Sequence, residues 1–295
     1  MYEVNVKIES VKFSKIVIID SLGLDESIDT AKYIHDYLIT LVQHFDIPVE
    51  LVKCANYIDF KKIMINLKNE VVNHNEIPII HVESHGSDSG LIFDNGSEMG
   101  WEEVANLLTN VNIETKFNLL AVFSACFGGY FVGEIKPIKS APCWCAIAPT
   151  QEVFPDELLN GFRIFYKKLF DTLDVGIASK TLDQTKLSSG KWFTQPIELW
   201  FEELMINYAK QYCLNNSADK QLKILFRRMK AEGTYVSKSF LKRLLKNEHK
   251  NLVEKYFEVF YSTKVVPENN QRFYKSKVKI LDEYCKLKST KKYLF

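Results

Sequence analysis

PIIHVESHG, residues Pro78–Gly86, is the segment from which the fold is most clearly predicted. It begins as a short apolar run with the length of a buried strand, and it stops at Ser84-His85-Gly86. The stretch Asn118–Gly129, NLLAVFSACFGG, has the same plan, with an apolar run that stops at Cys126. Strands of a parallel sheet are buried on both faces and carry such continuous apolar runs. The two stretches therefore predict two strands of one parallel sheet.

The surrounding sequence alternates similar runs with amphipathic stretches. We expect further strands at Lys15–Asp20, Pro48–Cys54 and Pro142–Ala148, and helices at Ser27–Phe45, Asp59–Val72, Trp101–Leu108, Asp156–Asp171 and Val175–Leu187. Strands that alternate with helices indicate an α/β fold whose sheet is mainly parallel and is covered by helices on both faces.

The last third of the chain has a different character. From Pro196 onward the pattern predicts helices and no strands, and a boundary near Ser188-Ser189-Gly190 gives two domains, residues 1–190 and 191–295. From Met205 onward there are 21 Lys and Arg against 8 Asp and Glu, a formal charge of +13, whereas the preceding residues carry −12. We expect this basic helical segment to pack on the acidic domain. Nucleic acid and an anionic membrane surface are the alternative targets.

The composition excludes several classes of protein. The hydrophobic fraction of 46% is enough for a large core, no apolar run is long enough to cross a bilayer, and no signal-peptide core is evident. We expect a cytoplasmic protein without membrane insertion, with its six cysteines as free thiols and without cofactors. Cys143 and Cys145 lack a second pair of ligands at metal spacing, so no metal is expected there. A metal held by His81, Glu83 and His85 on one strand face remains an alternative.

His85 and Cys126 each lie just beyond the carboxyl end of a predicted strand, the edge at which reacting groups of open α/β sheets gather. Gly86 and the pair Gly128-Gly129 allow backbone N–H groups to approach a substrate carbonyl closely. A thiol, a base and backbone donors are the minimum set for acyl transfer. Taken singly, each residue has a structural alternative, a small buried hydrophobe for the cysteine and a hydrogen-bonded group for the histidine.

These stretches resemble a known superfamily. Ile80–Phe93 resembles the strand and histidine loop of caspases, and Ser124–Gly129 resembles their cysteine loop, with Phe-Gly-Gly where caspases carry Arg-Gly. Trp144–Asp156 and the apolar positions that follow it are similar to the downstream strand and helix of CHAT domains, the bacterial branch of the caspase-like superfamily. The resemblance covers residues 15–187.

The resemblance implies a three-layer α/β/α caspase-hemoglobinase fold and a cysteine endopeptidase that works through a thioester acyl-enzyme. Cys126 would be the nucleophile and His85 its acid–base partner, with an oxyanion hole made by the backbone N–H groups of Gly86 and Cys126. The sequence supplies no evident third residue to orient His85, and this superfamily generally uses a dyad.

The expected substrate side departs from the family. Ser124 stands where caspases carry Gln, so neither an aspartate-specific pocket nor a metacaspase-type pocket is supported. The loop after the fifth predicted strand, which lines the cleft in this superfamily, holds Gln151, Glu152 and Asp156. We expect Glu152 to favour a basic residue before the scissile bond. Asp156 is better explained as a helix-start residue.

The family further implies a protein substrate, for example a gasdermin-like pore former, in a bacterial antiviral-defence or cell-death pathway. The sequence leaves open whether activation requires autocleavage, for which the Ser188–Gly190 loop is one candidate site. The alternatives are an inactive caspase-like interaction module and a nucleic-acid-binding protein that uses the +13 segment.

Overall fold

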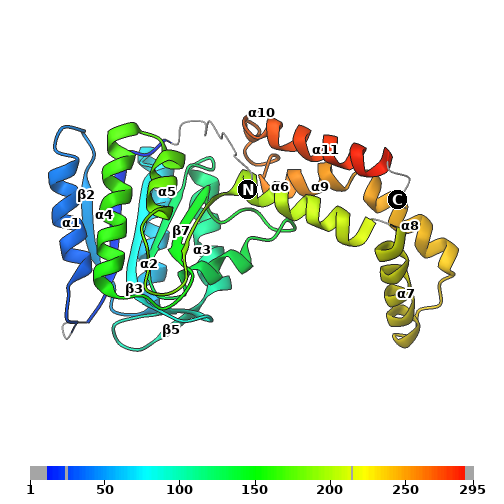
Figure 1. Cartoon of the computed structure of the whole chain (residues 1–295), viewed down its shortest axis with the longest axis horizontal. Helices are drawn as coiled ribbons and strands as arrows, with labels where there is room; N and C mark the ends of the chain where they lie inside the picture. The colour runs from blue at the N-terminus through cyan, green and yellow to red at the C-terminus, as the bar shows by residue number, and fades with distance from the viewer. Residues whose placement is uncertain (1–11, 24–25, 214, 290–295) are drawn as a thin grey trace. The chain divides into compact units, whose positions relative to one another are not determined.

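The computed structural model describes residues 12–23, 26–213 and 215–289, and the chain divides into two compact units (Figure 1). Unit 1 contains the residues up to Ile135 together with Ala141–Pro196. Unit 2 contains Lys136–Ser140 and the residues from Ile197 onward.

Unit 1 is built around a mostly parallel mixed sheet, which confirms the α/β class. Its strands are β1 (Lys15–Ser21), β2 (Val49–Lys53), β3 (Pro78–Gly86), β4 (Gly90–Ile92), β5 (Glu98–Gly100), β6 (Leu120–Ser124), β7 (Cys145–Pro149) and β8 (Trp192–Pro196). The order across the main sheet is β2-β1-β3-β6-β7-β8, and only β8 in this path runs antiparallel to its neighbour. β3 and β6 pair in register from Ile79 opposite Leu120 to Glu83 opposite Ser124, so the two strands of the opening stretches are adjacent, as expected.

Helices cover both faces of this sheet. They are α1 (Thr30–Leu41), α2 (Tyr57–His74), α3 (Trp101–Glu114), the 3-10 helix η1 (Gly128–Glu134), α4 (Pro155–Thr172) and α5 (Val175–Asp183). On one face, β3 side chains hydrogen-bond to Thr30 of α1 and Tyr166 of α4. On the other face, Phe123 of β6 packs against Trp101 of α3 and Phe131 of η1 (Figure 1).

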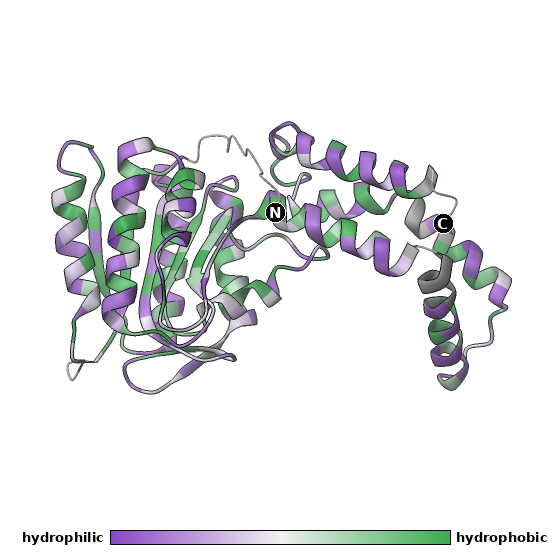
Figure 2. Cartoon of the chain, viewed as in Figure 1, coloured by the Kyte–Doolittle hydropathy of each residue, from purple (hydrophilic) through white to green (hydrophobic). Residues whose placement is uncertain are grey.

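The sequence explains these layers. β1 and β6 are buried along their whole lengths, and Figure 2 shows the strands of the sheet as predominantly hydrophobic ribbons. α4 buries Phe162, Phe165 and Leu169 at helical spacing, while the acidic Asp156 and Glu157 lie in its first turn, where carboxylates favour the helix dipole. Asp156 thus lies in the first turn of a helix, as expected.

Three strands were not predicted from the sequence. β4 and β5 have three residues each and form a small antiparallel extension on β3, too short to give an alternating pattern. β8 mixes polar and apolar residues and ends at Pro196, which is tolerated at the edge of a sheet. Because β8 belongs to the sheet, the two units divide after Pro196, whereas the expected boundary at residue 190 falls just before this strand.

Unit 2 is helical. Its elements are α6 (Ile197–Tyr208), the π-helix η2 (Ala209–Cys213), α7 (Asn215–Ala231), α8 (Lys238–Lys250), α9 (Leu252–Phe260), α10 (Asn269–Arg272) and α11 (Tyr274–Ser289). The helices α8 and α9 follow each other directly and divide at Asn251. Phe201 stacks on Phe260 with centroids 4.7 Å apart, and Tyr261 stacks on Phe273 at 4.2 Å, so the aromatic residues form the core of this unit.

Candidate active site

The tips of β3 and β6 are in direct backbone contact. A Cβ atom added to Gly86 would lie 2.3 Å from the carbonyl oxygen of Cys126 and 3.2 Å from the Cβ of Ala125. Only a glycine fits such an approach, because real Cβ atoms are not found under 3.0 Å from a backbone atom. The histidine loop and the cysteine loop therefore meet at one point, the carboxyl edge of the sheet.

Cys126 lies in the turn between β6 and η1 and is half-buried. Phe127 has a left-handed backbone with φ 58°, and the N–H of Gly128 donates to the Ala125 carbonyl, so the chain turns sharply at the thiol. The Sγ atom lies 3.7 Å from the carbonyl oxygen of Val153, in the loop before α4. The thiol thus lies against the loop that leads into α4 and is partly exposed.

His85 is held by a carboxylate that the sequence analysis did not single out. Its Nε2 atom lies 2.7 Å from Oε1 of Glu26, in the loop that precedes α1. The His85 side chain is 55% exposed and that of Glu26 is 27% exposed, so this ion pair lies at the surface. A carboxylate only accepts hydrogen bonds, so the pairing favours a proton on Nε2 and leaves Nδ1 to act as an acceptor.

In the described residues, no hydrogen bond joins the Cys126 thiol to the His85 ring; the thiol's acceptor is Val153. Catalytic hydrogen bonds are often long before substrate binds and shorten in the complex. His85 is the eighth residue of β3, and Cys126 follows two residues after the end of β6 at Ser124, which pairs with Glu83 of β3.

Two backbone N–H groups face the meeting point. The Ser87 N–H donates to the Gly90 carbonyl, and antiparallel alternation then makes Gly86 and Leu91 the pair that is not hydrogen-bonded. The N–H of Gly86 consequently points away from β4. The N–H of Cys126 donates to no acceptor in the described part of the chain. Both groups expected to form an oxyanion hole are thus open to a ligand.

Trp101, which the sequence analysis did not single out, holds this region together. Its indole N–H donates to the Ser87 carbonyl and its backbone N–H to the Ser89 carbonyl. Its ring packs edge-on against Phe123 of β6, with centroids 5.6 Å apart. One side chain thereby ties the loop after His85 to the strand that carries Cys126.

The residues expected to contact the substrate differ from one another in their burial and contacts. Ser124 is buried, and its hydroxyl has no hydrogen-bond partner in the described structure. Gln151 accepts the Phe127 N–H through its carbonyl and packs where a Cβ of Gly190 would be, so it supports the cysteine loop. Glu152 is exposed, between Gln151 and the carbonyl that contacts the thiol.

Exposed aromatic residues flank the cysteine loop as well. Phe154 is 64% exposed and Tyr130 is 47% exposed, and Tyr130 contacts the ring of Phe127 at 6.0 Å between centroids. The sequence analysis assigned them no role, because an exposed position near the thiol cannot be recognised without the tertiary structure. They supply exposed apolar surface beside Cys126.

His81 and Glu83 are engaged in a closed, buried polar network. Nε2 of His81 is 2.8 Å from one oxygen of Glu83, and Nδ1 is 3.0 Å from the hydroxyl of Tyr166. The other oxygen of Glu83 accepts a 2.7 Å hydrogen bond from Thr30. Burial, followed by the charge of Glu83, raises the pKa of Tyr166 well above its ordinary value. These contacts join β3 to α1 and α4.

The described residues contain no cluster of three or more His, Cys, Asp or Glu placed to hold a metal ion. His81 and Glu83 hydrogen-bond to each other, whereas His85 hydrogen-bonds to Glu26, so the three side chains do not converge on one metal position. Within the same residues, no helix has the length and apolar character needed to span a membrane.

The loop around Ser188, considered above for autocleavage, is tied to the start of α4. The Ser188 N–H and hydroxyl donate to the two carboxylate oxygens of Glu157, at 2.7 and 2.8 Å. The Lys191 carbonyl accepts the Thr150 N–H, and Gly190 has φ 69°. A cut here would release this loop from the segment that leads to α4.

Comparison of the sequence with protein-family models and with curated proteins finds no match to either. The assignment of a function therefore rests on the residues and their geometry.

Proposed function

We propose that this protein is a cysteine endopeptidase of the caspase-like superfamily, from its CHAT branch, with Cys126 as nucleophile, His85 as acid–base and Glu26 as the residue that orients His85. The observation that carries the proposal is the contact between Gly86 and the Cys126 carbonyl, which joins the histidine and cysteine loops. The sequence resemblance supplies the reaction, and the exposed hydrogen bond between Nε2 of His85 and the Glu26 carboxylate supplies a positioned base.

The chemistry follows from these groups. Nδ1 of His85 takes the proton of the thiol as Sγ attacks the carbonyl carbon of the scissile peptide bond, and the N–H groups of Gly86 and Cys126 stabilise the oxyanion. The carbon–nitrogen bond then breaks, and the imidazolium returns its proton to the leaving amine. Water, deprotonated by His85, hydrolyses the thioester and regenerates the thiol. Glu26 accepts from Nε2 throughout, which keeps the ring in the productive tautomer.

For specificity, we propose that Glu152 selects a lysine or arginine before the scissile bond. Glu152 is exposed, and it immediately precedes Val153, whose carbonyl contacts the thiol. Because Phe154 is exposed on the other side of that carbonyl, an apolar residue near the basic one fits the same surface. A protein partner, such as a gasdermin-like pore former in a bacterial defence or cell-death pathway, is the substrate that the resemblance suggests, with the cytoplasm as the compartment.

The test is digestion of a proteome-derived peptide library, with the new ends identified by mass spectrometry. The wild-type protein should cleave after Lys or Arg, whereas Cys126→Ala and His85→Ala should each lose cleavage while keeping the wild-type melting temperature. Glu152→Gln should weaken the basic preference. Cleavage by Cys126→Ala refutes the nucleophile, and wild-type protein that neither cleaves nor acylates Cys126 supports an inactive interaction module instead.

A further inference from the structure

Unit 2 carries a dense set of exposed cations that the proposed peptidase reaction does not use. Between residues 220 and 243, the segment α7–α8 exposes eight Lys and Arg and a single carboxylate, Glu232. We call these eight the basic segment: Lys220, Lys223, Arg227, Arg228, Lys230, Lys238, Lys242 and Arg243. Among the described residues, none of the eight forms an ion pair, although Lys238 lies 5.3 Å from the Phe226 ring centroid and Arg243 5.6 Å from that of Phe240.

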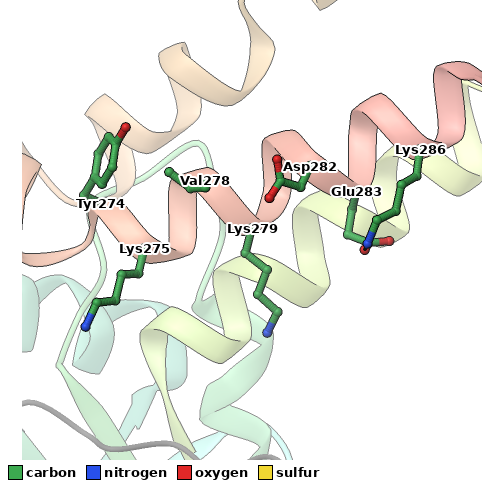
Figure 3. A pocket seen from close by; sticks show the side chains of 7 residues that line it. All are labelled: Tyr274, Lys275, Val278, Lys279, Asp282, Glu283 and Lys286. Atoms are coloured by element: carbon green, nitrogen blue, oxygen red, sulfur yellow. Dashed lines mark hydrogen bonds and ion pairs between the residues drawn. The ribbon is translucent and has the colours of Figure 1, made fainter.

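The cations of α11 in the same unit are placed differently. Figure 3 shows a surface pocket along this helix, lined by Tyr274, Lys275, Val278, Lys279, Asp282, Glu283 and Lys286. Here Lys279 pairs with Glu202 at 2.5 Å and Lys286 with Glu283 at 2.6 Å. Because these charges are neutralised within the protein, α11 does not attract anions as the basic segment does. The pocket also holds none of the candidate catalytic residues.

The geometry of α7 matches a phosphate backbone. At about 100° per residue, its five cations fall within an arc of about 160°, on the side opposite the buried Leu222. Lys220 and Lys230 are about 15 Å apart along the helix axis. One nucleic-acid strand presents a phosphate about every 3.4 Å of duplex axis, so this stripe spans about four phosphates. The spacing suits a line of cations laid along one strand.

A membrane surface fits less well. A helix that lies in a bilayer interface inserts a broad apolar face. In this segment the apolar Leu222 and Leu241 are buried within the protein. The exposed apolar side chains are Ile224 on α7 and Phe240 and Leu244 on α8, which are too few to form such a face. The exposed Tyr235, between α7 and α8, carries a hydroxyl that can donate a hydrogen bond to a phosphate oxygen.

We propose that the basic segment of α7–α8 is a binding surface for duplex nucleic acid, recognised through its phosphate backbone without sequence preference. This function goes beyond the proposed peptidase and does not depend on it. About four phosphate contacts predict a slope of about −4 for log affinity against log salt, and hence a roughly 250-fold loss between 50 and 200 mM salt.

The test is fluorescence anisotropy of the full chain with labelled 20-base-pair DNA and RNA duplexes of mixed sequence, across that salt range. The triple variant Lys223→Gln, Arg227→Gln, Lys230→Gln should bind weakly, with the slope reduced to about −1. The matched control removes the same charge from exposed lysines of unit 1, with Lys32→Gln, Lys62→Gln and Lys167→Gln, and should keep the wild-type slope.

Tighter binding of either the DNA or the RNA duplex identifies the nucleic acid that the basic segment prefers, and either result supports the proposed binding surface. Three results overturn the proposal: no duplex binding at 50 mM salt, an equal loss in the control triple, or co-sedimentation with phosphatidylserine vesicles while duplexes stay unbound. Circular dichroism of the triple variant ensures that a loss of binding is not a loss of helix.

Discussion

The substitution Gly86→Ala perturbs the contact on which the candidate site depends. The new methyl group would lie 2.3 Å from the carbonyl oxygen of Cys126 and 3.3 Å from its carbonyl carbon. Both atoms belong to the backbone, so relief requires the two strand tips to separate by roughly 1 Å, toward ordinary van der Waals distance. Such overpacking costs about 1–3 kcal/mol of stability. A displacement of about 1 Å at a reacting group costs about 100-fold in rate.

The measurement is kcat/KM on one peptide taken from the library, together with thermal unfolding. We expect Gly86→Ala to lose about 100-fold in kcat/KM and a few degrees in Tm. Gly133→Ala is the matched control, because nothing lies within 4 Å of its added Cβ, and it should behave as wild type. Wild-type activity in Gly86→Ala would contradict the proposed role of the contact between Gly86 and the Cys126 carbonyl, as would an equal loss of activity in Gly133→Ala.

Three further predictions follow from other contacts. Glu26→Gln removes the carboxylate charge beside the His85 imidazole. Under the proposed mechanism the loss of this half-exposed pair costs about 1 kcal/mol, so kcat/KM should fall about fivefold. Glu103→Gln removes a surface ion pair with Lys61 and should leave kcat/KM unchanged. Tyr166→Phe leaves a ring nitrogen of His81 buried without its partner and should cost about 1–3 kcal/mol in urea unfolding, and an unchanged midpoint would contradict the network. Burial raises the pKa of the Cys54 thiol from its ordinary 9.0 to about 11. The contribution of the neutral thiol to the free energy of unfolding should therefore be fully present below about pH 9 and be lost as the pH rises toward 11. The free energy of unfolding of Cys54→Ala should decrease less over that range, and an identical decrease in both proteins would exclude this origin.

The sequence predicted the central strands because their environment is simple. β1, β3 and β6 are buried on both faces, and continuous apolar runs record this directly. β8 was missed because an antiparallel edge strand carries both polar and apolar residues, and its partner β7 lies some 40 positions earlier in the sequence. The π-helix after α6 and the division of the helix at Asn251 depend on packing, which periodicity does not record.

The site was predictable where chemistry coincides with a strand end. His85, Gly86 and Cys126 each follow a recognisable apolar run, and strand adjacency brings them together. Glu26 was not predictable, because it lies in a loop without periodicity and meets His85 only through the fold. Ser124 illustrates the opposite limit, since its position suggested substrate contact but its side chain is buried.

The most direct test of the account compares two thiols within one molecule. Cys285 is exposed on α11, whereas Cys126 is only half-exposed, so accessibility alone favours alkylation of Cys285. If His85 activates Cys126, limiting iodoacetamide at neutral pH should label Cys126 first, as followed by peptide mass spectrometry, and His85→Ala should reverse the order. Faster labelling of Cys285 in the wild-type protein, or an order unaffected by His85→Ala, would contradict the proposed thiol–imidazole pair.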